Sequence, residues 1–265
     1  MAETILLEFA NGALRLHMAR IATLELNAPE RRNAMSAAMW AGLSEAVAAI
    51  AENDEVRVLL VRGAGGKAFC AGAHIGEFEE LYATARSARD YSAIIRAAQA
   101  DLSNLARPTI AVIEGACVGG GCGIALACDL RFAAADARFA ITPARLGLVY
   151  SYADTAQLIE KVGPARAKDI LFSGRMLDAQ EALRIGLIDR VCAGDALADE
   201  ALAYAQMLAG VSQASIRTAK RMVNRLSDLA ARGAPEMDAL ADAAFSSADF
   251  KEGYNAFLAK RPPSF

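Results

Sequence analysis

The stretch Gly115–Asp129, GACVGGGCGIALACD, joins an apolar segment to an alanine-rich one through three consecutive glycines, Gly119 to Gly121. Glycine adopts positive φ and lets a ligand approach the backbone closely. The first amides of the helix predicted to follow have no acceptor within it and lie at its positive dipole end. The turn is therefore a candidate site for a developing negative charge, and a tight strand-to-helix turn without a ligand is the alternative.

A second glycine-rich segment follows an apolar strand earlier in the chain. The predicted strand Val56–Val61 leads into GAGGKAFCAGAHI at residues 63–75, as the predicted strand Thr109–Ile113 leads into the triple glycine. Strand, glycine loop and helix therefore occur twice. The triple-glycine turn has neither the Gly-x-x-x-x-Gly-Lys-Ser/Thr phosphate motif nor the Gly-x-Gly-x-x-Gly dinucleotide motif, so it is not predicted to bind a nucleotide in those ways.

The rest of the chain alternates between short strands and helices. Residues 5–9, 14–18 and 21–26 predict an antiparallel opening, with Asn11-Gly12 in a hairpin turn. Helices are predicted from Ser36 to about Asn53, over 88–105, over 155–162, from Pro164 and from Asp178, and further strands over 130–134, 139–141 and 187–191. From about Asp195 onward the pattern is helical only.

Composition excludes several classes of protein. Hydrophobic residues make up 55% of the 265 residues, much of it alanine, and no run of about 18 apolar residues is free of charge, which argues against a membrane protein. Lys and Arg number 28 against 31 Asp and Glu, without the basic cluster of a nucleic-acid surface. Glu8 interrupts the first apolar run, which argues against a secretory signal, so a cytoplasmic location is expected.

The cysteines and histidines do not predict a metal site. Five cysteines stand in apolar or glycine-rich surroundings without a Cys-x-x-Cys pair, and we interpret them as reduced core residues. The chain has two histidines, His17 and His74, too few to complete an ordinary zinc site with them.

The helical tail carries more apolar surface than a lone lobe of its length should expose, for example at Met222, Val223 and Leu226. We interpret residues 195–265 as a helical oligomerisation lobe and residues 1–194 as the core domain.

Four separated segments resemble the crotonase (enoyl-CoA hydratase/isomerase) superfamily, in order and at the family's spacing, and the resemblance covers nearly the whole chain. The segments are residues 27–35, 67–75, 115–129 and 162–168, the last followed by Gly174-Arg175 and Glu181–Leu183. The resemblance implies an α/β fold, a crotonase-like spiral of ββα turns with a C-terminal all-helical trimerisation lobe. It also implies an acyl-CoA thioester substrate, no cofactor beyond the CoA moiety of that substrate, and a homotrimer or dimer of trimers.

The resemblance further implies which backbone groups act. It places the two oxyanion amides of the family on Ala71 and Gly120. Two preorganised donors of this kind stabilise the charge on a thioester oxygen by several kcal/mol, on the order of 3 each. Because the donors are backbone N–H groups, substitution by proline, which removes the N–H, should impair the site more than substitution by alanine.

Other positions are implied for CoA itself. Arg32 with Ala34, and Ala73 with Ile75, fall along the pantetheine and nucleotide arm. Two further residues match the family's end, where an aromatic and a lysine reach the nucleotide of a neighbouring subunit; they are Phe257 and Lys260, and a packed helical aromatic is the alternative for Phe257.

The chain departs from the hydratases of the family at its acid and base positions. The two hydratase glutamates fall on Gly123 and Pro143, and a third acidic position used by some isomerases and dehalogenases falls on Ser151. Losing such groups costs about 10² to 10⁴ each in a reaction that needs them. Ordinary enoyl-CoA hydration is therefore doubtful.

The remaining polar residues near the thioester are His74, Tyr150, Tyr152 and Asp154, and packing is the role expected of Tyr152. Residues 142–150, TPARLGLVY, resemble methylmalonyl-CoA decarboxylase-type members, although those keep a glutamate at the position of Gly123. Decarboxylation of a malonyl-type thioester yields the enolate without a base. A relocated base, His74 or Asp154, in an isomerase or hydratase is a second hypothesis, and a catalytically silent CoA-binding subunit is a third. Helix capping is the alternative role for His74 and for Asp154.

Overall fold

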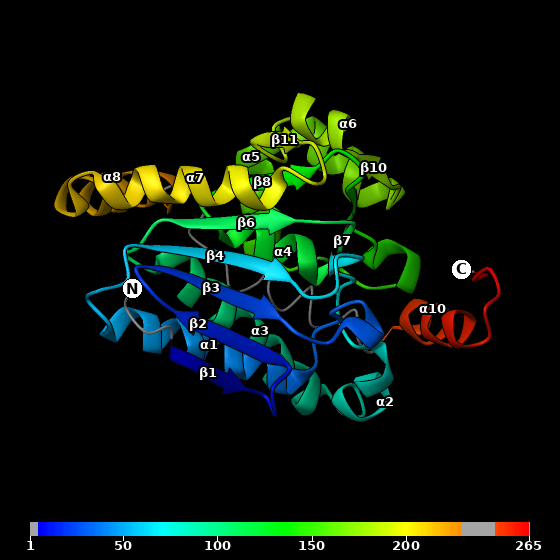
Figure 1. Cartoon of the computed structure of the whole chain (residues 1–265). Helices are drawn as coiled ribbons and strands as arrows, with labels where there is room; N and C mark the ends of the chain where they lie inside the picture. Colours follow the sequence, from blue (N-terminus) through cyan, green and yellow to red (C-terminus); the bar gives the residue numbers. More distant parts are fainter. Residues whose placement is uncertain (1–4, 229–246, 265) are drawn as a thin grey trace.

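Two β-sheets organise the computed structural model, which describes residues 5–228 and 247–264 (Figure 1). The larger sheet has seven strands in the order β1-β2-β3-β4-β6-β8-β11, antiparallel from β1 to β3 and parallel beyond. Its strands are β1 (Ile5–Phe9), β2 (Leu14–Met18), β3 (Ile21–Leu26), β4 (Val58–Gly63), β6 (Thr109–Ile113), β8 (Leu130–Ala134) and β11 (Arg190–Cys192). The smaller sheet has the order β10-β9-β7-β5, from β5 (Ala68–Cys70), β7 (Ala116–Val118), β9 (Arg138–Ala140) and β10 (Leu177–Asp178).

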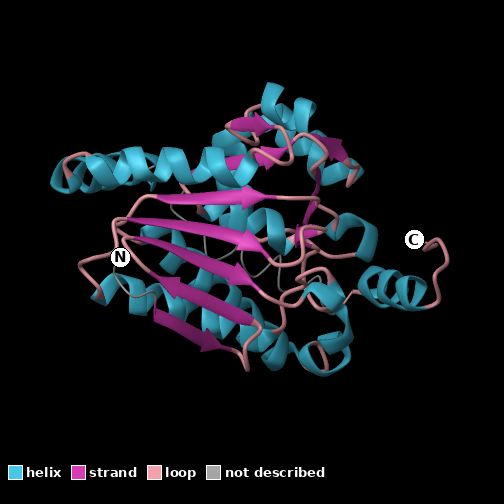
Figure 2. Ribbon diagram, in the orientation of Figure 1, coloured by secondary structure: helices cyan, strands magenta, loops and turns pink. Residues whose placement is uncertain are grey.

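Helices cover both faces of the larger sheet, as Figure 2 shows. Helices α1 (Ala37–Glu52) and α3 (Ala85–Asn104) pack together on one side, and α7 (Leu197–Gly210) packs across β4, β6 and β8 on the other. The other helices within the described ranges are η1 (Pro29–Arg31), η2 (Ile75–Glu77), α2 (Phe78–Leu81), α4 (Gly120–Ala127), η3 (Pro143–Leu146), α5 (Tyr152–Ser173), α6 (Ala179–Arg184), α8 (Gln213–Asp228) and α10 (Ala248–Leu258).

The central strands are apolar on both faces because each face meets a different core. Leu59 and Val61 of β4 belong to the core beneath α1, whereas Val58 and Leu60 belong to the core beneath α7. Side chains of a strand alternate between its faces, so a continuous apolar run is what a strand buried on both sides requires. The predicted spiral is confirmed: a strand of the larger sheet, a short strand of the smaller sheet and a helical segment succeed one another along the chain.

Most predicted elements are confirmed, and several bounds differ; α3, for example, begins at Ala85 rather than Ala88. Ser36 caps α1 by accepting a hydrogen bond from the Met39 amide, as expected. The last strand is β11 (Arg190–Cys192) rather than residues 187–191, and β4 begins at Val58 rather than Val56. The helix expected at residues 155–162 already begins at Tyr152.

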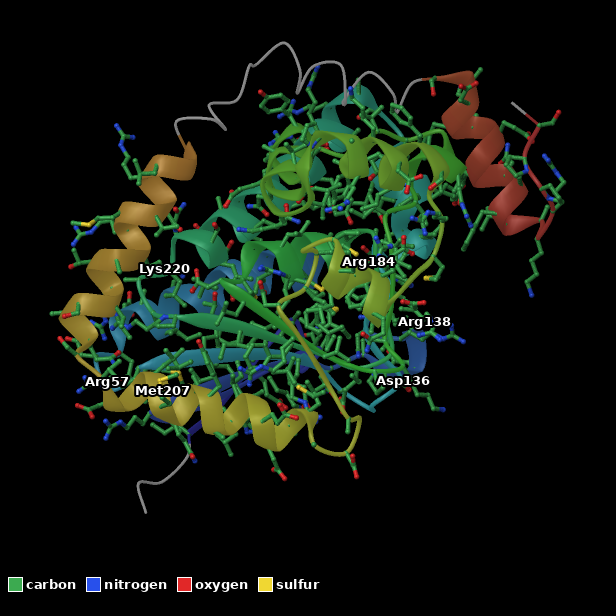
Figure 3. All side chains as sticks on the ribbon, turned by 90° about the horizontal axis from the view of Figure 1, so that it is seen from above. Arg57, Asp136, Arg138, Arg184, Met207 and Lys220 are labelled. Atoms are coloured by element: carbon green, nitrogen blue, oxygen red, sulfur yellow. The ribbon has the colours of Figure 1, made fainter. Side chains whose placement is uncertain are left out.

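The α8 helix is tied to the rest of the chain by a partly buried ion pair. The Nζ of Lys220, labelled in Figure 3, donates to Asp129 Oδ2 (2.8 Å) and to the Arg107 carbonyl (3.0 Å). The outer side chains Met222, Val223 and Leu226 are exposed. Oligomerisation through this lobe stays a prediction, as does the division at residue 195; α7, which follows that point, supplies Leu197 to the second core.

Two glycines hold α10 against η3. A Cβ on Gly147 would collide with the backbone of Asp249, and a Cβ on Gly253 would collide with the backbone of Leu146. This close approach places Phe250 of α10 against Phe78, with ring centroids 6.3 Å apart. Helix α10 thereby supports an aromatic cluster next to the candidate site, formed by Phe78, Tyr82, Phe250 and Tyr254.

We expect Gly253→Val to detach α10, because its side chain has no space against Leu146. Overpacking of this kind costs about 1–3 kcal/mol, and here it acts on the docking of one terminal helix. Amide hydrogen exchange should show α10 deprotected while the larger sheet keeps its protection. Gly210→Val is the matched control, since nothing lies within 4 Å of the Cβ that it would add.

Candidate active site

The triple glycine brings the start of α4 against the end of β5. A Cβ on Gly121 would collide with the Cys70 carbonyl, so only glycine permits this approach. Gly119 has φ of 52° and its amide donates to the Ala140 carbonyl (2.8 Å). Gly120 is the first residue of α4, and its amide therefore has no acceptor within the helix.

The loop after β5 presents a second free amide to the first. The Met35 amide donates to the Gly72 carbonyl and the His74 amide to the Met35 carbonyl, each over 2.8 Å, which fixes this loop. The Ala73 amide between them has no acceptor in the part of the chain that the structure describes. A Cβ on Gly120 would lie 3.9 Å from the Ala73 nitrogen. Two unpaired backbone donors thus stand side by side.

The prediction that Ala71 supplies one of these donors is wrong. Its amide donates to the Arg32 carbonyl over 3.0 Å, which ties the loop to residues 27–35. Gly72 has φ of 107°, so the chain turns there and directs the next amide elsewhere. The donor beside Gly120 is therefore the Ala73 amide.

A cavity of about 150 Å³ opens beside these two amides. Its volume corresponds to roughly five water-sized groups at about 30 Å³ each, which suits a short acyl group. Its lining comes from α1, the loop and α2 after β5, α3, α4 and the segment from η3 to α5; the residues are Trp40, Ala73, Phe78, Tyr82, Tyr91, Ser92, Ile95, Arg96, Gln99, Gly120, Pro143, Leu148, Val149, Tyr150, Ser151 and Asp154.

Asp154 places a carboxyl group in this cavity. Its Oδ2 accepts a hydrogen bond from the Ser151 hydroxyl (2.7 Å), and the residue is 6% exposed. Burial raises the pKa of Asp154 to about 6, against the opposing influence of Ser151 and of the Gln99 amide. Ser151, not Asp154, caps α5, so the capping role considered for Asp154 is wrong and its carboxyl group is free for chemistry.

Gly123 makes room for a polar pair at the floor of the cavity. A Cβ there would collide with Gln99 Nε2 and would lie 3.0 Å from Asp154 Oδ1. Gln99 on α3 and Asp154 on α5 therefore fill the space that a side chain at position 123 would take. Position 123 itself has no carboxyl group, but the carboxyl group of Asp154 lies next to it.

Four buried side-chain donors lie around the cavity, and three of them interact with a neighbour: Trp40 with Tyr91, and Gln99 with Asp154. The fourth, Tyr150 Oη, has no hydrogen-bond partner among the described residues. Burial raises the pKa of both tyrosines above its ordinary value, so both keep their protons. Native structures leave few buried polar groups unpaired, so Tyr150 Oη points to a ligand or water that accepts from it.

Tyr150 was expected at the site, and the structure confirms that it lines the cavity. His74 does not line it. The His74 Nδ1 lies 3.3 Å from Glu77 Oε1, and the side chain makes no capping hydrogen bond to η2. The structure thus supports neither of the roles considered for His74.

The residues expected along the CoA arm are brought together at one edge of the site. Met35 and Ala73 form a parallel bridge that joins residues 32–34 to residues 73–75. Phe257 and Lys260 are exposed and lie outside the cavity lining. Their contact with a neighbouring subunit stays a prediction, as does CoA binding by the first group.

Sequence reasoning did not single out Trp40, Tyr91, Arg96 or Gln99. Three of them lie on α3, where Ser92, Ile95, Arg96 and Gln99 follow helical spacing. The signal available in the sequence was a glutamine at helical spacing from Ile95 and Leu102; the structure shows that it is 4% exposed, and buried polar residues are the informative exceptions.

The described residues give no sign of a metal or of a membrane span. Within 5–228 and 247–264 no three histidine, cysteine, aspartate or glutamate residues are grouped so as to hold a metal ion. In the same ranges no helix has the length and apolarity to cross a bilayer.

The fold and the paired backbone amides define a class of protein, and comparison identifies it. Residues 17–265 match the model of the enoyl-CoA hydratase/isomerase family. The chain belongs to this family, within the crotonase superfamily.

Individual relatives cover almost the whole chain. A crotonyl-CoA hydratase of Syntrophomonas wolfei is 32% identical over 248 residues, 93% of this chain and 94% of the relative. The crystal structure of an enoyl-CoA hydratase/isomerase family protein from Hyphomonas neptunium is similar at 45% identity and a TM-score of 0.79, covering 95% and 97% of the two chains. A methylmalonyl-CoA decarboxylase with bound 2-nitronate-propionyl-CoA is similar at 27% identity and a TM-score of 0.86, with the same coverage.

Proposed function

We propose that the protein binds a short acyl-CoA and forms the enolate of its thioester. The Ala73 and Gly120 amides have no acceptor among the described residues, and both residues line an acyl-sized cavity. Such donors stabilise the oxygen of an enolate more than that of the ground-state carbonyl, which is the requirement for catalysis. Family membership supports an acyl-CoA substrate, with residues 32–34 and 73–75 along its CoA arm.

We propose Asp154 as the group that removes and returns the α-proton. The observation that carries this assignment is a carboxyl group in the same cavity, buried and with its pKa raised to about 6. A base acts best when its pKa is near the working pH. The function is then that of an isomerase or hydratase with a relocated base. In isomerisation Asp154 takes the α-proton, the charge of the dienolate is held by the Ala73 and Gly120 amides, and the proton returns to the γ-carbon as the double bond shifts. In hydration Asp154 takes a proton from water as the oxygen of that water bonds to the β-carbon, and the proton then passes to the α-carbon of the enolate.

This mechanism predicts how proton exchange depends on pH. Incubation with butyryl-CoA in D₂O should introduce deuterium at the α-carbon, and its rate should rise with pH to a plateau with a midpoint near 6, because only ionised Asp154 accepts the proton. Mass spectrometry of the recovered thioester measures the exchange. Tight binding of butyryl-CoA without exchange at any pH would indicate a silent CoA-binding subunit instead.

Decarboxylation of a malonyl-type thioester is the second candidate. Tyr150 places an unpartnered hydroxyl in the cavity beside Pro143, and a methylmalonyl-CoA decarboxylase is similar to this chain over 95% of its length. Loss of CO₂ leaves the same enolate, held by the same two amides, with no need for Asp154 as a base. Turnover of crotonyl-CoA but not of methylmalonyl-CoA would exclude this candidate.

A further inference from the structure

Arg96 is a cation without a described counterion at the wall of the acyl cavity. It projects from α3, lines the cavity and has no ion pair or hydrogen bond among the described residues. A guanidinium on a cavity wall is suited to an anionic ligand, since guanidinium and carboxylate form charge-assisted, often bidentate, hydrogen bonds.

The position of Arg96 along α3 separates it from the reacting end of the cavity. Gln99 marks that end, because it adjoins Asp154 beside Gly123. Arg96 lies three residues earlier, which is roughly 4.5 Å along the helix axis and nearly one turn. A group that contacts Arg96 therefore lies several atoms along the acyl chain from the thioester carbon.

An unpaired donor in the cavity lining favours the same kind of ligand. The Tyr150 hydroxyl is buried there without a partner among the described residues. An aliphatic acyl chain would leave this donor unsatisfied, which is costly for a buried polar group, whereas an oxygen atom of an acyl substituent would accept from it.

We infer that the substrate carries a carboxylate at the far end of its acyl chain and that Arg96 binds it. This inference rests on the proposed acyl-CoA function and names the class of acyl group, a short dicarboxylic monothioester. Asp154 sits at the opposite end, beside the α-carbon, so its negative charge is separated from that of the substrate.

Binding can be measured directly, because Trp40 is the single tryptophan of the chain and lines the cavity. Titration with glutaryl-CoA and with its neutral isostere 5-methylhexanoyl-CoA, followed by tryptophan fluorescence, gives both dissociation constants. Wild-type protein should bind glutaryl-CoA roughly 10- to 100-fold more tightly, as a charge-assisted hydrogen bond implies. Arg96→Met should remove that preference and leave the affinity for 5-methylhexanoyl-CoA within about threefold.

Arg89→Met is the matched control, since Arg89 is an exposed arginine of the same helix outside the cavity lining. It should keep the wild-type preference. Equal affinity of wild-type protein for the two ligands, or a preference that survives in Arg96→Met, would overturn the inference about Arg96. A failure of the proposed function is distinct: then neither acyl-CoA binds, or both bind and neither exchanges its α-protons in D₂O.

Discussion

Asp154→Asn is expected to slow α-proton exchange by about 10²- to 10⁴-fold, the usual contribution of a positioned general base. The amide keeps the size of the side chain and an acceptor for the Ser151 hydroxyl, which now lies 2.7 Å from Oδ2. It does not accept a proton from carbon. Binding of the same acyl-CoA, measured by Trp40 fluorescence, should change far less than exchange, because Asp154 contributes the chemistry rather than the cavity.

The stability of this variant provides the control. The pKa of Asp154 is raised from 3.8 to about 6, so folding favours the protonated carboxyl group. The associated stabilisation is present below about pH 4 and is lost as the pH rises through 6. At pH 8 the wild-type protein therefore carries a cost on the order of 3 kcal/mol, at about 1.4 kcal/mol for each pH unit by which the pKa is raised, and Asp154→Asn should recover much of it.

Loss of exchange with a gain in the free energy of unfolding would separate a catalytic role from a structural one. Ser151→Ala offers a graded comparison. It removes the hydrogen bond from the Ser151 hydroxyl to Asp154 Oδ2, which lowers the pKa of Asp154, so the midpoint of the exchange profile should move to higher pH while activity on the plateau remains. Exchange at the wild-type rate in Asp154→Asn would contradict the assignment of Asp154 as the base.

The strands and the glycine turns were predictable because their causes are local in the sequence. An uninterrupted apolar run such as Val58–Val61 indicates a strand that is buried on both faces. Ser36 ahead of an amphipathic run indicates the start of a helix. The triple glycine was also informative, since Gly121 must lack a Cβ for α4 to meet the Cys70 carbonyl. Each of these features is determined by neighbouring residues in the chain or by one close approach between two backbone segments.

The identity of the second donor was not predictable in this way. The loop was located from its residues, but the direction of each amide depends on the turn at Gly72 and on the Arg32 carbonyl, far from it in sequence. The same holds for the carboxyl group. Asp154 has the residue type and spacing of a helix cap, and only packing of α5 against Gln99 and Gly123 shows that it faces the cavity.

Ala73→Pro is expected to reduce the rate of exchange by about 10²- to 10³-fold, because proline removes the amide hydrogen that would hold the enolate oxygen. That amide has no acceptor among the described residues, so the substitution breaks no hydrogen bond of the folded chain. The free energy of unfolding should consequently stay near that of the wild type. Binding of S-butyl-CoA, a thioether without the carbonyl oxygen, should also be retained, and Trp40 fluorescence reports it.

Ala71→Pro is the matched comparison, two positions away in the same loop. Its amide donates to the Arg32 carbonyl over 3.0 Å, so this variant should lose about 1 kcal/mol or more of stability. The molecules that stay folded should retain most of their exchange activity, since the Ala73 and Gly120 amides remain in place. Two results together would show that Ala71 supplies the donor instead. Ala73→Pro would exchange at the wild-type rate, and folded Ala71→Pro would have lost its exchange activity. Enolate stabilisation at this site therefore depends on which of the two amides the turn at Gly72 directs toward α4.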